Sequence, residues 1–164
     1  MGCNGGWLDN AWDYLEKKGI VTDQCFPYTA GGGRAPACNA ACKTENKKYK
    51  CKKGTVQRFD GPDAIKNEVS THGPIEVAFT VYNDFFNYKT GIYKHVSGGM
   101  AGGHAVKLVG YGVQGTTKYW ICANSWNTSW GEQGFFRIEE GQCGIENGAY
   151  ACEPDLDDFS IFLQ

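Results

Sequence analysis

The sequence predicts an α+β protein whose C-terminal half is dominated by an antiparallel sheet. Three patterns lead to this prediction. Apolar residues recur at helical spacing near the N-terminus, alternate at strand spacing from Ile75 to Val81, and form two β-type segments on either side of Gln114-Gly115. A chain of 164 residues is long enough to bury a core and to form one domain or slightly more.

The first third of the chain is predicted to hold one helix and then a long irregular region. The apolar face of this helix consists of Leu8, Ala11, Trp12 and Leu15. Gly19 is placed as the stop of the helix, because glycine readily adopts the left-handed conformation found there. From Thr22 to Gly54, cysteines, glycines and prolines predict a loop region with little regular structure.

The rest of the chain is predicted to contain one helix and several strands. Pro62 to His72 has proline in its first turn and is followed by Gly73-Pro74, which predicts a helix with defined ends. The alternating strand consists of Ile75, Val77, Phe79 and Val81. Further strands are expected from His104 to Gly112, from Lys118 to Asn124 and from Phe135 to Glu139, with Cys143 to Ala151 continuing or bordering the sheet.

Composition argues against several classes of function. With 16 basic and 18 acidic residues the formal net charge is −2, so we expect no nucleic-acid partner. No apolar run approaches the roughly 18 residues of a membrane span, so no membrane partner is expected either. Eight cysteines indicate disulfides and an oxidising compartment. Cys38 and Cys42 with Cys51 are a weak zinc alternative without a fourth ligand, so neither a metal nor a cofactor is expected.

One histidine and one asparagine are predicted to meet across a hairpin. If the turn is centred on residue 114, partner numbers sum to 228, which pairs His104 with Asn124 on one face at a Cβ distance of roughly 4.5 to 5.5 Å. An imidazole held by an amide is half of a Cys-His-Asn arrangement, in which the ring acts as base to a thiol. A structural contact is the alternative, but nearby glycines and Trp126 favour a site.

Several motifs resemble those of papain-family cysteine peptidases and occur in the family's order. They are Gly2-Cys-Asn-Gly-Gly6, Gly73-Pro-Ile75 with Ala78-Phe79, Gly102-Gly-His-Ala105, Asn124-Ser-Trp126, Trp130-Gly131 and Gly134-Phe-Phe136. Within that family a second group resembles cathepsin B, namely Cys25-Phe-Pro-Tyr28, the Cys38 and Cys42 pair, Val81-Tyr-Asn-Asp-Phe85 and Cys143-Gly-Ile-Glu146. The resemblance extends from Gly2 to about Pro154.

The resemblance implies a papain-like fold made mainly of the right-hand antiparallel β-barrel domain, with the last helix of the left-hand helical domain. Residues 1–24 would end the left domain, 25–154 would form the right domain with a shortened occluding-loop region at 26–37, and 155–164 would be a tail. His104 would be the catalytic base and acid, and Asn124 would orient it. Substrate-binding roles fall on Gly5, Gly6, Trp7, Ala78, Gly103, Ala105, Trp126 and Gly148.

The chain also departs from the family pattern. The C-G-[SA]-C-[WY] segment that carries the family's nucleophilic cysteine is missing, together with the family's oxyanion glutamine. The expected partners are therefore an N-terminal portion carrying that cysteine and peptide or protein substrates. The complete protein would be a cysteine endopeptidase and this chain alone would be inactive. The expected location is lysosomal, vacuolar or extracellular.

Two further departures concern specificity. The region 26–37 has no histidine, so the peptidyl-dipeptidase activity of cathepsin B is expected to be weak or absent. Gly148 stands where cathepsin B often has an acidic residue in its S2 pocket. The resemblance therefore implies apolar or aromatic residues at P2, the second substrate residue before the cleaved bond, with basic ones disfavoured.

The resemblance also implies one disulfide and leaves other cysteines open. Cys25 would pair with Cys42, whereas Cys3 and Cys38 would lack their family partners. No pairing is assigned to Cys51, Cys122, Cys143 and Cys152.

Two other classes of function remain open. A catalytically inactive, peptidase-like binding or structural protein is one alternative. Another Cys-His enzyme, such as an acyl or amide transferase, is the second, because it would use the same nucleophile and base.

Overall fold

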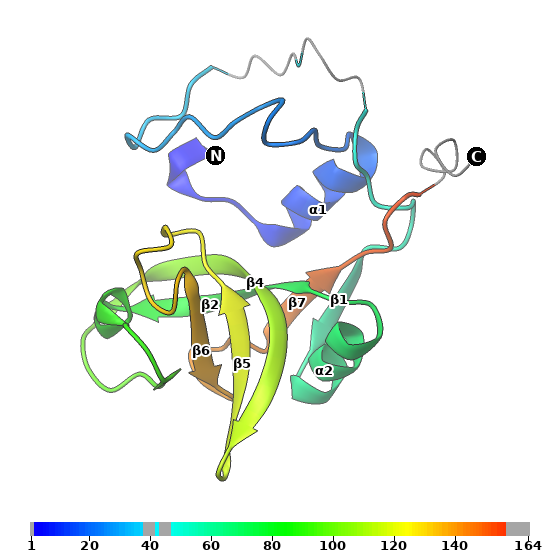
Figure 1. Ribbon diagram of the computed structural model, residues 1–164. Coiled ribbons are helices and arrows are strands. Elements are labelled where there is room, and N and C mark those ends of the chain that lie inside the picture. Colours follow the sequence, from blue (N-terminus) through cyan, green and yellow to red (C-terminus); the bar gives the residue numbers. More distant parts are fainter. Residues whose placement is uncertain (1, 38–41, 43–46, 157–164) are drawn as a thin grey trace. The chain divides into compact units, whose positions relative to one another are not determined.

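The computed structural model describes residues 2–37, 42 and 47–156 (Figure 1). The chain divides into two compact units, Met1–Gln57 with Cys152–Gln164, and Arg58–Ala151. We call them unit 1 and unit 2. The division expected from the family, with borders at residues 24/25 and 154/155, stays a prediction.

Unit 1 contains the predicted N-terminal helix. After a 3-10 turn over Gly2–Asn4, helix α1 spans Leu8–Lys17 and ends at Lys18. Gly19 has a φ of +72°, and a Cβ there would lie 2.6 Å from Cγ of Lys50. Only glycine fits both conditions, which explains the helix stop. No helix in the described part of the chain is long and apolar enough to cross a bilayer.

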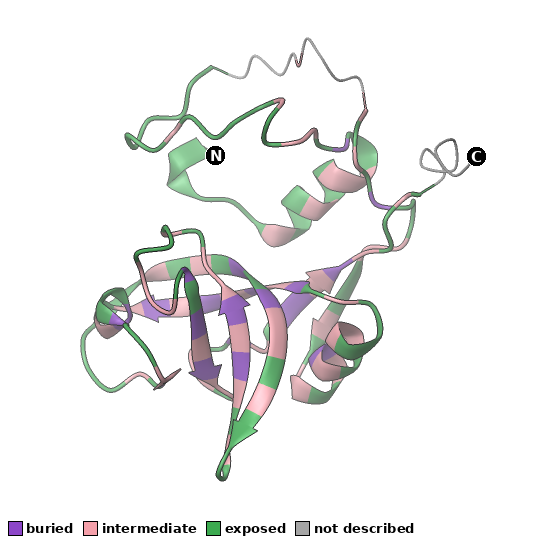
Figure 2. Ribbon diagram, viewed as in Figure 1, coloured by how far each residue is buried: buried purple, intermediate pink, exposed green. Residues whose placement is uncertain are grey.

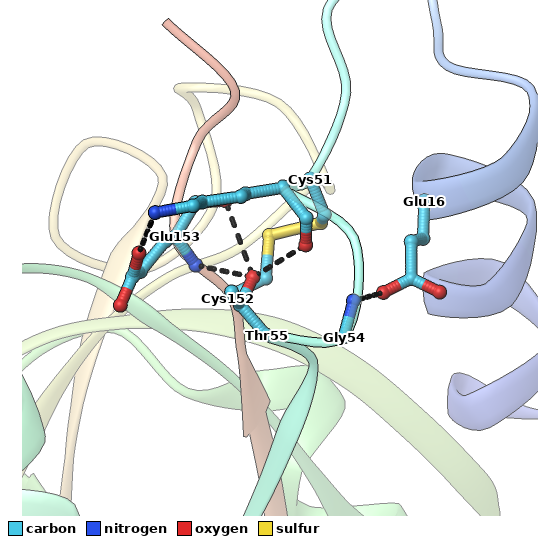
Figure 3. Close-up of a disulfide and its surroundings, with 7 residues drawn as sticks. Glu16, Cys51, Gly54, Thr55, Cys152 and Glu153 are labelled. Atoms are coloured by element: carbon cyan, nitrogen blue, oxygen red, sulfur yellow. Dashed lines mark hydrogen bonds and ion pairs between the residues drawn. A yellow bond between two sulfur atoms is a disulfide. The ribbon is translucent and has the colours of Figure 1, made fainter.

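Two disulfides hold the irregular segments of unit 1. Cys25 is bonded to Cys42, as the resemblance implied, with their Cα atoms 5.5 Å apart. Cys51 is bonded to Cys152, a pair to which the sequence assigned no partners (Figure 3). These bonds occupy Cys42 and Cys51, two of the three cysteines of the zinc alternative; Cys38 lies outside the described residues.

Hydrogen bonds surround the second disulfide (Figure 3). The backbone N–H of Lys52 donates to the carbonyl of Glu153 over 2.8 Å, and the N–H of Glu153 donates to Oγ1 of Thr55 over 3.2 Å. The N–H of Gly54 donates to a carboxylate oxygen of Glu16. The segment after Cys51 is thereby joined both to the segment after Cys152 and to α1.

Unit 2 is built around a seven-stranded sheet with the order β1-β7-β2-β4-β5-β6-β3 (Figure 1). The strands are β1 Gln57–Asp60, β2 Ile75–Tyr82, β3 Ile92–Tyr93, β4 Met100–Gln114, β5 Thr117–Ala123, β6 Phe135–Glu139 and β7 Asn147–Ala151. Helix α2 spans Pro62–Thr71, and a 3-10 helix, η2, spans Asn83–Asn87. The α+β fold with a mainly antiparallel sheet is confirmed; β3 and β6 run parallel.

The hydrophobic core lies on one face of this sheet. Strand β2 alternates strictly between buried and half-buried residues, as its sequence predicts (Figure 2). Phe85 of η2 is fully buried and packs edge-on against Phe79 and Phe136, with ring centroids 5.1 and 5.0 Å away. The short strands β1 and β3 were not predicted, because two to four residues carry too little periodicity.

The hairpin forms with a different register from the predicted one. Gln114 pairs with Thr117, so partner numbers sum to 231 near the turn. A bulge between Leu108 and Gly110 changes the sum to 230, and Lys107 pairs with Ala123. The predicted sum of 228 is therefore wrong. The turn lies one to two residues further along the chain than expected, and the bulge inserts one residue into β4.

Candidate active site

His104 and Asn124 nevertheless form the predicted hydrogen bond. Nε2 of His104 lies 2.8 Å from Oδ1 of Asn124. The two residues are not partners in the ladder: His104 pairs with Phe79 of β2, and Asn124 is the first residue after β5. The N–H of Asn124 donates to the carbonyl of Gly134, which holds the chain as it leaves the strand. The contact depends on this loop geometry.

The orientation of the amide determines the tautomer of the imidazole. Oδ1 of Asn124 also accepts a 2.8 Å bond from the backbone N–H of Ser125, which can only donate. Oδ1 is thus the acceptor in both contacts, and Nε2 of His104 must carry a proton. The other ring nitrogen, Nδ1, then has the lone pair in the neutral ring and can accept a proton.

Trp126 covers this pair. Its ring stacks on the imidazole of His104 with centroids 5.0 Å apart and planes 21° apart. The other side chains around the indole include Phe86, stacked at 5.4 Å, and Trp130, edge-on at 5.1 Å. Nδ2 of Asn124 is buried and has no hydrogen-bond partner. An unsatisfied buried amide costs stability, and such costs are typical of functional sites.

The strand next to the imidazole presents an open surface. Gly103 and Ala105 are exposed, and a Cβ added to Gly103 would meet no atom within 4 Å. Ala78 of β2 pairs with Ala105. At position 98, by contrast, packing requires glycine, because a Cβ built there would lie 2.8 Å from Cβ of Asn83. The small residues beside His104 therefore leave room for another molecule.

The predicted substrate-binding residues fall in both units. Unit 2 holds Ala78, Gly103, Ala105, Trp126 and Gly148, all from the sheet or the loop after β5. Unit 1 holds Gly5, Gly6 and Trp7, and Trp7 is 70% exposed. The roles of all eight residues stay predictions.

The described cysteines outside disulfides are Cys3, Cys122 and Cys143. Burial raises the pKa of the Cys122 thiol far above its ordinary value. Burial also raises the pKa of Cys143, to about 11, with a further contribution from Asp84. Thiols with raised pKa values are poor nucleophiles. Cys3 is exposed in unit 1 and is not part of a disulfide.

The other two histidines of the chain have contacts of their own. Nδ1 of His72 lies 2.9 Å from the carboxylate of Glu68 on α2. His95 stacks on Tyr82 with centroids 3.7 Å apart, and its Nδ1 lies 3.2 Å from Asp84. His104 is thus the histidine that the structure pairs with an amide beside an open surface.

Comparison with known proteins identifies the family of the chain. The family model described as "Papain family cysteine protease" matches residues 1–152. The chain is 41% identical to "Cathepsin B-like cysteine proteinase 6" of Caenorhabditis elegans, over 99% of the chain and 52% of that protein. It is 44% identical to "Cathepsin B-like CP2" of Giardia intestinalis, over 92% of the chain and 52% of that protein.

A solved structure supports the same assignment. The fold matches "proCathepsin B S9 from Trypanosoma congolense" with a TM-score of 0.83 and 36% identity, over 93% of this chain and 55% of that one. The chain therefore belongs to the papain family of cysteine peptidases. Within this family it is cathepsin B-like, and it spans about half the length of the curated relatives that it matches.

Proposed function

We propose that the complete protein is a cysteine endopeptidase in which this chain supplies the histidine and the asparagine. The main support for this proposal is the 2.8 Å hydrogen bond between Nε2 of His104 and Oδ1 of Asn124, which lies beside exposed, small residues of β4. The nucleophilic cysteine would come from an N-terminal portion. Apart from Cys3, the described cysteines of this chain are in disulfides or have thiols whose pKa is raised by burial.

The geometry supports a defined sequence of proton transfers. Nδ1 of His104 takes the proton of the catalytic thiol, and the thiolate sulfur bonds to the carbonyl carbon of the substrate. The imidazolium then gives this proton to the leaving amine as the C–N bond breaks, which leaves an acyl-thioester. Nδ1 next takes a proton from water, the resulting hydroxide attacks the thioester, and the thiolate leaves. Throughout, Asn124 holds Nε2–H and so keeps Nδ1 directed at the reaction.

Internal cleavage is the expected mode of action. Capture of a substrate's C-terminal carboxylate by cathepsin B relies on two histidines of the occluding loop, and residues 26–37 contain none. His72 and His95 are engaged with Glu68 and Asp84. The complete enzyme should therefore cut within chains and release few C-terminal dipeptides.

Proteolysis assays test this proposal with three samples. They are the 164-residue chain, the same chain mixed with the N-terminal portion, and the complete protein, each incubated with fluorescently labelled casein at mildly acidic pH with a low concentration of thiol. We expect cleavage by the complete protein, some cleavage by the mixture and none by the chain alone. Loss of a triad's nucleophile lowers the rate by many powers of ten.

Matched variants identify the residues responsible. His104→Ala should abolish cleavage by the complete protein, whereas His72→Ala, which removes an exposed histidine of α2, should not. The chain alone could show turnover that is lost when one of its own cysteines is replaced. That result would place the nucleophile in this chain and contradict the proposal. A folded complete protein that cleaves nothing would support the inactive, peptidase-like alternative.

A further inference from the structure

An arginine occupies the space that a side chain at residue 148 would fill. Gly148 has a φ of +96°, and a Cβ built on it would lie 3.1 Å from both Nε and Nη2 of Arg58 and 3.2 Å from its Cζ. Three guanidinium atoms at nearly equal distances mean that the plane of the group lies over the Gly148 backbone. A Cβ at position 148 would require the guanidinium to shift by a few tenths of an ångström.

Gly148 lies in line with two of the predicted substrate-binding residues. Glu76 of β2 pairs with Tyr150 of β7, and extending this antiparallel register by two residues brings Ala78 opposite Gly148. Ala78 in turn pairs with Ala105 of β4. Gly148, Ala78 and Ala105 thus form a row of small residues across three adjacent strands.

This row faces away from the core. Its neighbours along the strands, Val77, Phe79 and Ala149, are buried in the core, and side chains alternate between the two faces of a sheet. On β1, Phe59 packs against the core, which places Arg58 on the same face as the row. The side chain of Arg58 is 56% exposed, so a bound molecule can reach it.

At one end of the row, the guanidinium of Arg58 forms an ion pair with Asp60. Nη2 of Arg58 donates to Oδ1 of Asp60 over 3.0 Å, which uses one of the five N–H groups of a guanidinium. In the next row, Glu76 pairs directly with Lys107, so its carboxylate has a cation opposite it. Arginine binds carboxylates through two parallel hydrogen bonds, a geometry that its planar group suits.

We propose that Arg58 makes the S2 pocket selective for acidic P2 side chains, glutamate or aspartate. The inference rests on the proposed function and refines the apolar preference expected from Gly148 alone. The row of small residues receives the aliphatic part of the P2 side chain, and the guanidinium binds its carboxylate. Lysine and arginine at P2 are rejected by like charge.

Kinetics of the complete enzyme on matched peptides test this inference. The peptides differ only at P2, which is Glu, Gln, Phe or Arg, and kcat/KM is measured for each. We expect Glu to exceed its neutral isostere Gln by about tenfold, with Arg the poorest. Arg58→Met should bring the Glu/Gln ratio close to one, whereas Arg58→Lys should keep part of the preference.

Two further variants separate this effect from general electrostatics. Asp60→Asn removes the competing carboxylate and should raise the Glu/Gln ratio. Lys118→Met removes an exposed positive charge on β5, away from the row, and should leave the ratio unchanged. An active enzyme that cleaves Gln as well as Glu, or an Arg58→Met variant with the native ratio, would overturn the inference while the proposed function stands. Failure to cleave any peptide or casein would instead refute the proposed function.

Discussion

At the scale of single residues, the amide of Asn124 determines which nitrogen of His104 carries a proton. Its Oδ1 accepts from both Nε2 of His104 and the N–H of Ser125, so the amide cannot rotate without losing two bonds. Ser125 was not among the predicted site residues. Its contribution comes from the backbone, which no side-chain pattern reveals.

Replacing Asn124 by alanine should slow catalysis without unfolding the protein. In the complete enzyme we expect kcat to fall by about 100-fold, because the imidazole loses the bond that fixes its tautomer and orientation. KM should change little. Steady-state kinetics on one peptide check this result.

Asn67→Ala on the exposed face of α2 is the matched control and should retain native kcat. Native kcat in the Asn124→Ala enzyme would show that the hydrogen bond is structural only. Circular dichroism of both variants would confirm that the fold is retained.

At the scale of elements, a carboxylate joins the loop before β3 to the middle of β6. Glu132 accepts from Nε of Arg137 over 3.0 Å and from Nη2 over 2.6 Å. It also accepts from Oγ1 of Thr90 and from the N–H of Gly91 at 2.8 and 2.9 Å. These bonds support the parallel pair of β3 and β6, which is far too short to be stable alone.

The pKa of Glu132 makes this stabilisation dependent on pH. Hydrogen bonds from Arg137 are the main cause that lowers the pKa from 4.5 to about 2. Because the folded pKa lies below the unfolded one, the stabilisation is complete above about pH 4.5 and is lost as pH falls towards 2. Glu132→Gln should therefore lower the free energy of unfolding at pH 7 by about 1 to 2 kcal/mol, allowing for solvent screening.

Urea unfolding followed by tryptophan fluorescence at pH 7, 5, 4 and 3 measures this effect. The difference between wild type and Glu132→Gln should shrink below pH 4.5. Glu153→Gln serves as a control, since its ion pair with Lys52 is well exposed and should contribute little. A difference that stays constant down to pH 3 would contradict the assigned pKa.

At the scale of the whole molecule, the bond between Cys51 and Cys152 closes a loop over 101 positions of sequence (Figure 3). That loop includes all of unit 2, whose chain leaves unit 1 at Gln57 and returns at Cys152. Closing so long a loop removes conformational entropy from the unfolded chain. The disulfide therefore stabilises the folded state against complete unfolding.

Removing this disulfide should cost about 2 to 4 kcal/mol of stability. The variant is Cys51→Ala with Cys152→Ala, and urea unfolding under non-reducing conditions measures the loss. Cys3→Ser, a change at an exposed free cysteine, is the control and should leave the midpoint unchanged. Equal midpoints for the double variant and wild type would show that the bond adds no stability.

Periodicity in the sequence predicted α1, α2, β2 and β6, because the side-chain repeat of a helix or strand is a local property. The motifs around His104 and Asn124 predicted the family and the hydrogen bond between the two residues. Local patterns also placed Gly19 at the end of α1, where its positive φ is a property of one residue.

Only the tertiary structure decided how distant segments meet. The bulge between Leu108 and Gly110 changed the hairpin register, although the loop after β5 still carries Asn124 to His104. The pairing of Cys51 with Cys152 and the approach of Arg58 to Gly148 join residues about 90 to 100 positions apart. Such contacts depend on the packing of whole strands, because a shift of one residue in a register turns every side chain to the other face.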